Sequence, residues 1–192
     1  MLTRALFTLL WTFVVAQRLW EVRISKRHEA ALREAGAREH ASAQMPWMML
    51  LHTLWLAAML LEVWLLRRPF SFALGAPALL LFGLGQGLRI LAMRTLGERW
   101  TVRVVTPTSG EPPVTRGIYR YLRHPNYLWV ALEILALPLV HGAYLTSLLF
   151  TPLNALLLWV RIRAEERALA ETSSYASLFA QRPRFVPKAF SP

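Results

Sequence analysis

Four long apolar runs, separated by arginine-rich segments, constrain the fold of this chain more than any other feature. The runs cover residues 2–22, 46–66, 72–93 and 127–160. A membrane helix needs about 20 mostly apolar residues to cross a hydrocarbon core of roughly 30 Å. Hydrophobic residues make up 55% of the chain, more than a soluble domain of this size usually carries. The pattern therefore predicts an all-α integral membrane protein.

The last apolar run is interrupted at Pro138 and again at residues 141–144. Proline suits the first turn of a helix, so we expect a short helix from Pro125, a tight turn, and a second helix from Tyr144 into Arg163. This C-terminal helical hairpin raises the expected total to about five transmembrane helices. At about 1.5 Å per residue the first arm is too short to cross the membrane, so it either stops part way or is buried against other helices.

Positive charges fix the expected topology. Segments 23–45, 94–123 and 161–192 hold five, six and six Lys or Arg residues, whereas the opposite side holds Arg4, Arg67 and Arg68. The positive-inside rule places the three basic segments in the cytoplasm and the N-terminus outside. The N-terminal run has no clear cleavage site, so we expect a retained helix and not a signal peptide. Membrane orientation also explains the net charge of +11 better than nucleic-acid binding does.

The connecting segments suggest small additions to one membrane domain, residues 1–192. We divide it into three N-terminal helices (1–93) and a core with the hairpin (94–192), the part that contains the candidate site discussed below. Residues 23–40 predict a surface helix with an i, i+4 pair of Glu34 and Arg38. Residues 101–105 alternate like a short strand, and 109–113 form a turn. Gly83, Gly85 and Gly87 suggest a close helix approach.

The amino-acid composition excludes several kinds of functional site. The chain has no cysteine, which excludes disulfides, thiolate metal sites and a cysteine nucleophile. All 11 acidic residues are glutamates, so carboxylate chemistry depends on Glu alone. His28, His40 and His141 lack metal-ligand spacing, and we expect no metal site. The glycines of residues 83–87 lack the strand–turn–helix context of a phosphate-binding loop.

Two polar segments flank the hairpin and form the candidate site. The free N–H groups of a helix that starts at Pro125, beside Arg123 and His124, favour anions. On the returning helix, Arg161 and Glu165 are four residues apart and can pair. An alternative interpretation is that Arg161 and Glu165 form an ordinary ion pair where the helix leaves the membrane. However, the hairpin brings both segments to one side of the membrane, where a soluble cofactor can meet a lipid.

Together these segments resemble a known family. The run Gly117-Ile118-Tyr119-Arg120-Tyr121-Leu122-Arg123-His124-Pro125-Asn126-Tyr127, an apolar hairpin, and Arg161-Ile162-Arg163-Ala164-Glu165-Glu166-Arg167 resemble the isoprenylcysteine carboxyl methyltransferase family over about residues 80–190. The N-terminal elements Glu21-x-Arg-x-Ser-x-Arg-His and Gly36-Ala37-x-Glu39 resemble small bacterial members that methylate alkylpyrones or alkylresorcinols. The resemblance implies an integral membrane methyltransferase that uses S-adenosylmethionine at a cytoplasmic site.

The resemblance also implies roles for individual residues. His124, Pro125 and Tyr127 match the His-Pro-x-Tyr element that binds the cofactor, and Glu165 and Glu166 match the family's Glu pair. The expected cofactor-binding set is Tyr119, Leu122, Arg123, His124, Pro125, Tyr127 and Glu166. The expected catalytic residues are Arg161 and Glu165, and the expected substrate residues are Glu133, Asn154 and Arg184. Either Arg161 or Arg184 would orient an acidic oxygen of the acceptor.

The acceptor remains open at this point. The main hypothesis is O-methylation of a lipophilic carboxyl, enol or phenol oxygen, on a prenylcysteine-like or alkylpyrone-like molecule. One alternative is N-methylation of a phospholipid headgroup. A second is an NADPH-dependent membrane reductase, because sterol reductases carry a related Arg-His-Pro-Asn-Tyr element, although this chain is short for that class. A third is a non-enzymatic membrane assembly protein. The oligomeric state is not indicated by the sequence.

Overall fold

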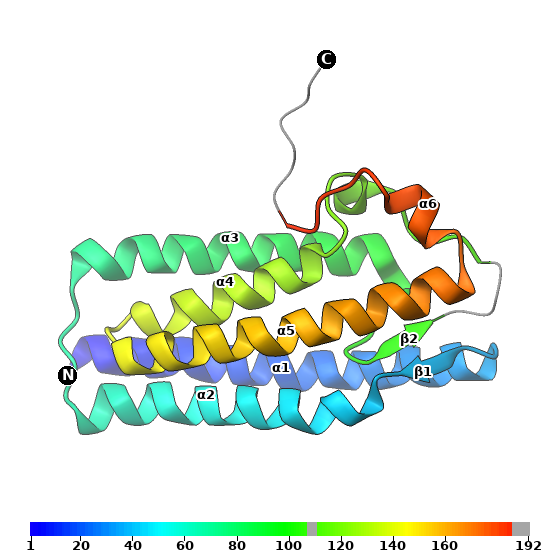
Figure 1. The fold of residues 1–192 in the computed structure, drawn as a ribbon. Helices are drawn as coiled ribbons and strands as arrows, with labels where there is room; N and C mark the ends of the chain where they lie inside the picture. Colours follow the sequence, from blue (N-terminus) through cyan, green and yellow to red (C-terminus); the bar gives the residue numbers. More distant parts are fainter. Residues whose placement is uncertain (107–110, 186–192) are drawn as a thin grey trace, which may run out of the picture.

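The computed structural model describes residues 1–106 and 111–185, and it is a bundle of long helices with a small sheet at one end (Figure 1). Four helices are long and apolar enough to cross a membrane: α1 (Leu2–Glu34), α2 (Met45–Leu65), α3 (Phe72–Leu96) and α5 (Tyr144–Thr172). The shorter elements are β1 (Arg38–His40), η1 (Ser42–Gln44), η2 (Gly97–Arg99), β2 (Val104–Thr106), η3 (Gly117–Arg120), α4 (Pro125–Leu139) and α6 (Tyr175–Phe179).

The expected hairpin is present. α4 and α5 are antiparallel and joined by residues 140–143, where Gly142 adopts φ +69°. With 15 residues α4 is about 22 Å long at ~1.5 Å per residue, so four of the described helices have spanning length, and a fifth passage that includes α4 stays a prediction. Figure 1 shows that α4 starts further inside the bundle than the neighbouring ends of α3 and α5. The α4 start therefore lies where polar segments and the apolar bundle meet.

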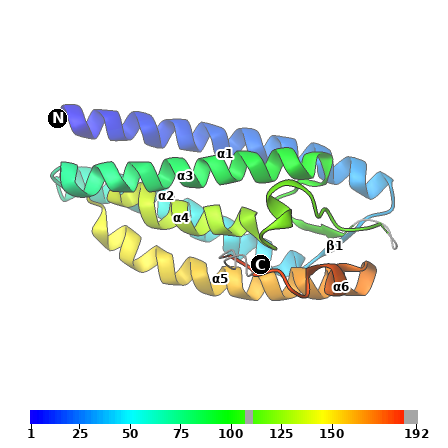
Figure 2. The same cartoon turned by 90° about the horizontal axis from the view of Figure 1, so that it is seen from above.

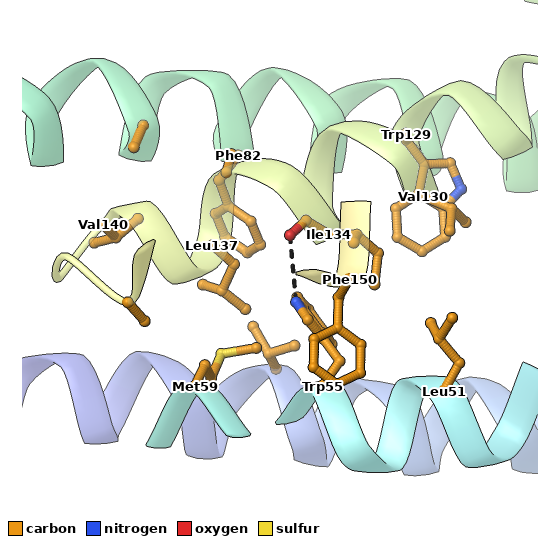
Figure 3. Packing of buried hydrophobic residues seen from close by; sticks show 14 of the residues in the cluster. Leu51, Trp55, Met59, Phe82, Trp129, Val130, Ile134, Leu137, Val140 and Phe150 are labelled. Atoms are coloured by element: carbon orange, nitrogen blue, oxygen red, sulfur yellow. Dashed lines mark hydrogen bonds between the residues drawn. The ribbon is translucent and has the colours of Figure 1, made fainter. Parts of the chain in front are cut away.

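The core lies around α4. Figure 2 shows α1 and α5 on opposite edges of the bundle, with the other long helices between them. Figure 3 shows Trp55 and Met59 of α2 facing Ile134 of α4, with Phe150 of α5 beside them. The Trp55 indole donates a hydrogen bond to the Ile134 carbonyl at 3.3 Å, which satisfies the one polar atom of this buried side chain. α4 is thus held on several sides, and its orientation is fixed.

Two helices are longer than hydropathy predicts. α1 ends at Glu34 and not at residue 22, and α5 extends to Thr172 and not only to Arg163. In α1 the residues Glu21, Ser25 and Glu29 are buried at four-residue spacing, and the Ser25 hydroxyl accepts a hydrogen bond from the Val102 amide at 2.8 Å. A polar buried face stabilises the helix there, so a search for apolar runs misses it.

The connecting segments also differ in part from expectation. Arg38 lies in β1, so the predicted helical pair with Glu34 does not form; Arg33 binds Glu39 instead. The predicted strand at 101–105 begins at Val104, and β2 pairs antiparallel with β1. This sheet is the departure from an all-α fold. The predicted turn at 109–113 lies partly outside the described residues.

Close helix contact occurs at a glycine other than the three predicted. A Cβ at Gly83 or Gly87 would meet no atom within 4 Å, and a Cβ at Gly85 would make an ordinary contact with α4. Glycines at alternate positions cannot share one face of a helix with 3.6 residues per turn. At Gly75 a Cβ would lie 2.8 Å from the Val140 carbonyl oxygen, so this glycine allows α3 to approach the end of α4.

Candidate functional site

The start of α4 is positioned by a tight approach of the preceding chain. Gly117 opens η3 with φ +55°, and a Cβ there would lie 2.6 Å from the Thr95 hydroxyl oxygen of α3. Glycine accommodates both the left-handed backbone and the contact. Pro125 occupies the first turn of α4, as the sequence predicted. Its side chain is fully buried. His124 is the residue before the helix, and its side chain is buried.

The hairpin brings the two polar segments together. His124 Nε2 lies 3.0 Å from Glu166 Oε1, and the Tyr127 hydroxyl donates a hydrogen bond to Glu165. The expected proximity of the α4 start and the α5 end is therefore confirmed. What each residue does there remains a prediction.

Arg161 joins this cluster through Tyr127. Its Nε donates to the Tyr127 hydroxyl oxygen at 2.9 Å, and its Nη2 donates to the Val102 carbonyl. The expected pair of Arg161 and Glu165 is thus linked through a shared tyrosine hydroxyl. Arg161 and Tyr127 are both buried, which makes a fully hydrogen-bonded arrangement necessary.

The C-terminal segment forms hydrogen bonds with the residues that lead into α4 and with Glu166. The Arg123 amide donates to the Pro183 carbonyl at 3.0 Å, and the His124 amide donates to the Arg184 carbonyl at 3.2 Å. These two amides precede the helix and already have carbonyl acceptors, so they are not available to an anion. Of the helix's own first amides, which the expectation concerned, that of Tyr127 donates to the His124 carbonyl at 3.1 Å. Arg184 also binds both oxygens of Glu166, at 3.0 and 2.6 Å. Arg184 thus lies at the site, but on the Glu pair.

A cavity of about 140 Å³ opens beside these residues. Five of the predicted site residues line it: Tyr119, Arg123, His124, Tyr127 and Glu165. Small-molecule sites usually enclose roughly 300–1,000 Å³, so a cofactor-sized ligand requires part of the lining to move outward.

The other predicted site residues lie around or away from this cavity. Leu122 and Pro125 are buried behind it, in the chain that positions the lining side chains. Glu133 binds Arg18 of α1, and Asn154 is buried in α5 with no partner for its Oδ1 among the described residues. The structure therefore does not bring Glu133 and Asn154 to the cavity.

Several lining residues were missed by sequence reasoning. Trp100 and Asn126 contribute one wall, and Tyr175 and Phe179 of α6 contribute another. The two α6 rings stack at 4.7 Å between centroids. Asn126 lies inside the quoted motif, so its position was a usable signal. The α6 pair reaches the site only through the fold of the chain after α5, which no local pattern predicts.

The tyrosines of the cavity wall stay neutral at physiological pH. Burial raises the pKa of Tyr119, and the charge of Glu165 raises it further. Burial also raises the pKa of Tyr175, with added contributions from Glu166 and Glu165. Both phenols therefore remain protonated and act as hydrogen-bond donors or as ring surfaces, not as anions.

Comparisons with known proteins identify a family and two relatives to which this chain is similar. The model of the isoprenylcysteine carboxyl methyltransferase (ICMT) family matches residues 78–171, which include both polar segments and the hairpin. The uncharacterized protein YpbQ of Bacillus subtilis (strain 168) is 37% identical over 169 residues, covering 88% of this chain and 99% of that protein. An uncharacterized protein of Haemophilus influenzae is 30% identical over 163 residues, covering 82% of this chain and 91% of that protein.

Proposed function

The chain belongs to the isoprenylcysteine carboxyl methyltransferase family, and we propose that it transfers the methyl group of S-adenosylmethionine to an oxygen of a lipophilic acceptor. Membership makes the protein an integral membrane methyltransferase, which agrees with four helices of spanning length. The observation that carries the finer proposal is the meeting of the two motifs at one cavity, where Tyr127 and Glu165 face the same space.

The donor set of the cavity fits this cofactor. The cofactor carries an ammonium group, a carboxylate, a sulfonium and an adenine ring. Glu165, and not Glu166 as the resemblance implied, faces the cavity and suits the ammonium. The Arg123 guanidinium donates to the Ala180 and Arg182 carbonyls here, and it suits the carboxylate once it exchanges these partners. The stacked rings of Tyr175 and Phe179 offer an apolar face for the adenine.

The residues of the chain contribute positioning and charge. When bound, the cofactor supplies an activated methyl group: the acceptor oxygen forms a bond to carbon while the carbon–sulfur bond breaks and its electron pair stays on sulfur. We assign to Arg161, which is held by Tyr127 and by the Val102 carbonyl, the role of orienting an acidic oxygen of the acceptor. An ionised carboxylate or enolate needs no base, so alignment supplies most of the rate.

We further propose where the acceptor and the membrane lie. The acceptor is an alkylpyrone-like, alkylresorcinol-like or prenylcysteine-like molecule. The two bacterial relatives support a bacterial inner membrane, with the basic end of the bundle and the cavity in the cytoplasm. In this view α4 and residues 117–124 together complete a fifth passage through the membrane. The whole chain then acts as one domain.

The direct test uses purified protein in lipid nanodiscs with methyl-labelled S-adenosylmethionine. The panel contains long-chain alkylpyrones, alkylresorcinols, prenylated cysteines and phosphatidylethanolamine. We expect cofactor binding by calorimetry and label on an oxygen of one of the first three classes. Label on phosphatidylethanolamine alone would assign N-methylation. Saturable NADPH binding without S-adenosylmethionine binding would assign a reductase, and absence of both binding and transfer would end the enzymatic proposal.

A further inference from the structure

Four ionised side chains form a second polar centre inside the bundle, apart from the cofactor cavity. Arg18 and Glu21 come from α1, Arg89 from α3 and Glu133 from α4; we name these four residues the buried ion cluster. Arg18 binds Glu21 at 2.9 Å and also binds Glu133, and Arg89 binds Glu21. The exposed fractions of Glu21, Arg89 and Glu133 are 2%, 1% and 2%. Ionised groups at this depth are costly and usually mark function.

The buried ion cluster has more donors than acceptors. Nε of Arg18, and Nε and Nη1 of Arg89, have no hydrogen-bond partner among the described residues. Gln17, which is not part of the cluster, binds Glu21 through its amide nitrogen at 3.2 Å, and its Oε1 has no partner among the described residues. Both guanidinium groups lie over the Trp129 ring, with Cζ at 4.4 and 4.0 Å from the ring centroid. A ligand that complements these atoms must present an oxygen acceptor and not an ammonium group.

The buried ion cluster is connected to the cofactor cavity along one face of α4. Asn126, Trp129 and Glu133 follow each other at spacings of three and four residues, and so share that face. The Trp129 indole donates to Asn126 Oδ1 at 3.0 Å, and the Trp100 indole donates to the same oxygen at 3.2 Å. Asn126 and Trp100 both line the cavity. Polar groups therefore run from the cavity wall into the apolar bundle.

We propose that the buried ion cluster is a head-group subsite for the methyl acceptor. It binds an ionised or carbonyl oxygen of an amphiphile whose hydrocarbon chain lies against the apolar helices. This inference rests on the proposed function, and it favours oxygen-headed acceptors over aminophospholipids. Arg89 is the main binding residue, because it is fully buried, has two unpartnered nitrogen atoms, and is held in place by Glu21.

The test measures acceptor binding without the cofactor, in nanodiscs, with a long-chain 4-hydroxy-2-pyrone as the probe. A primary alkylamine of equal chain length is the comparison ligand. Arg89→Lys keeps the charge beside Glu21 but removes the guanidinium nitrogen atoms that have no partner. We expect the pyrone to bind about tenfold more weakly to this variant, because charge-assisted hydrogen bonds from the guanidinium group are lost. The affinity for S-adenosylmethionine should stay within about twofold of wild type.

Glu62→Gln is the matched control, because Glu62 is also buried, at 7% exposure, but binds Arg68 near the opposite end of the bundle. It reports the general effect of altering a buried ion pair. Arg18→Lys serves as the second variant if Arg89→Lys does not fold, since Arg18 Nε is also unpartnered and its side chain is 20% exposed.

The outcomes separate this inference from the proposed reaction. Weaker pyrone binding in Arg89→Lys, without any methyl transfer by wild type, would support the subsite and overturn the reaction. Methyl transfer by wild type with unchanged pyrone binding in the variants would overturn the subsite and leave the reaction standing. Equal binding of the amine, or equal loss in Glu62→Gln, would also overturn the subsite and leave a purely structural ion cluster.

Discussion

Glu165 and Glu166 are neighbours in the sequence but have different surroundings. Glu165 lines the cavity and accepts a hydrogen bond from Tyr127, whereas Glu166 is engaged by His124 and Arg184. The carboxylate that faces the cavity is the one available to a cationic ligand. The other carboxylate fixes the start of α4 and the C-terminal segment.

This division predicts unequal effects of two matched substitutions. Glu165→Gln should weaken S-adenosylmethionine binding by about tenfold or more, because a charge-assisted contact to the ammonium is lost. Glu166→Gln should mainly lower the melting temperature, because Arg184 loses its bidentate partner. Calorimetry and thermal unfolding of both variants make the comparison. Equal loss of cofactor affinity in the two variants would contradict the division.

The position of Tyr127 leads to a second prediction, which concerns the rate of methyl transfer. Its hydroxyl joins Arg161 to Glu165, so Tyr127→Phe removes the bridge while preserving the ring. We expect the rate of methyl transfer to fall by about tenfold or more, because misplaced catalytic groups lose alignment. Tyr121→Phe is the control, since Tyr121 belongs to the same motif but is 45% exposed. A Tyr127→Phe variant with wild-type kcat would show that the bridge is dispensable.

Sequence reasoning predicted which residues meet here but not the directions of their side chains. The motifs predicted that His124, Tyr127 and the Glu pair meet, and they do. Adjacent residues of a helix point about 100° apart, so which glutamate faces the cavity depends on the rotation of α5 against α4. Packing of the whole bundle sets that rotation. The occupation of Glu166 by Arg184 depends on the path of the C-terminal segment, which no periodicity records.

At the scale of elements, Glu62 anchors the returning arm of the hairpin. Its carboxylate, on α2, accepts hydrogen bonds from the Leu145 amide at 3.1 Å and from the Thr146 amide at 2.8 Å. The first N–H groups of a helix have no intrahelical partner, and a carboxylate there also favours the helix dipole. α2 thereby fixes where α5 begins.

Glu62→Ala should therefore destabilise the hairpin. The loss is expected to be roughly 1.5–3 kcal/mol, because hydrogen bonds from two helix-start amides are removed and Arg68 loses its partner. Denaturation in mild detergent measures it, and hydrogen exchange should locate the extra opening at residues 144–148. Thr172→Ala, at the far end of the same helix, controls for a general effect. Uniform loss of protection along α5 would contradict a local anchor.

Element boundaries show where sequence reasoning failed. Apolar runs correctly predicted the cores of α2 and α3. The surface helix predicted over residues 23–40 is the polar continuation of α1, which ends at Glu34, whereas the polar continuation of α5 to Thr172 was not predicted. β1 and β2 pair residues that are far apart in the sequence, such as Arg38 and Thr106, which are separated by 68 positions. A three-residue strand has little local signal, and its stability comes from a partner that the sequence pattern does not identify.

At the scale of the whole molecule, the helices sort the chain into two ends of different charge. The start of α1, the α2–α3 connection and the α4–α5 turn lie together: Arg4 donates to the Arg67 carbonyl, and the His141 ring contacts Phe7. The small sheet, η3 and α6 lie at the opposite end, as Figure 1 shows. This separation agrees with the sequence-based division of the basic segments, and the cavity lined by Tyr119, His124 and Glu165 lies at the more basic end.

The orientation in the membrane follows as a prediction from charge. Because the natural chain has no cysteine, a single introduced cysteine reports accessibility without background. Ser71→Cys, at the exposed start of α3, should react with a membrane-impermeant maleimide applied to whole cells. Ser177→Cys, exposed on α6, should react only after the membrane is permeabilised, since excess Lys and Arg hold that end in the cytoplasm. The reverse labelling pattern would place the cavity outside, away from the cytoplasmic supply of S-adenosylmethionine, and would remove the premise of a soluble cofactor that enters from the basic end.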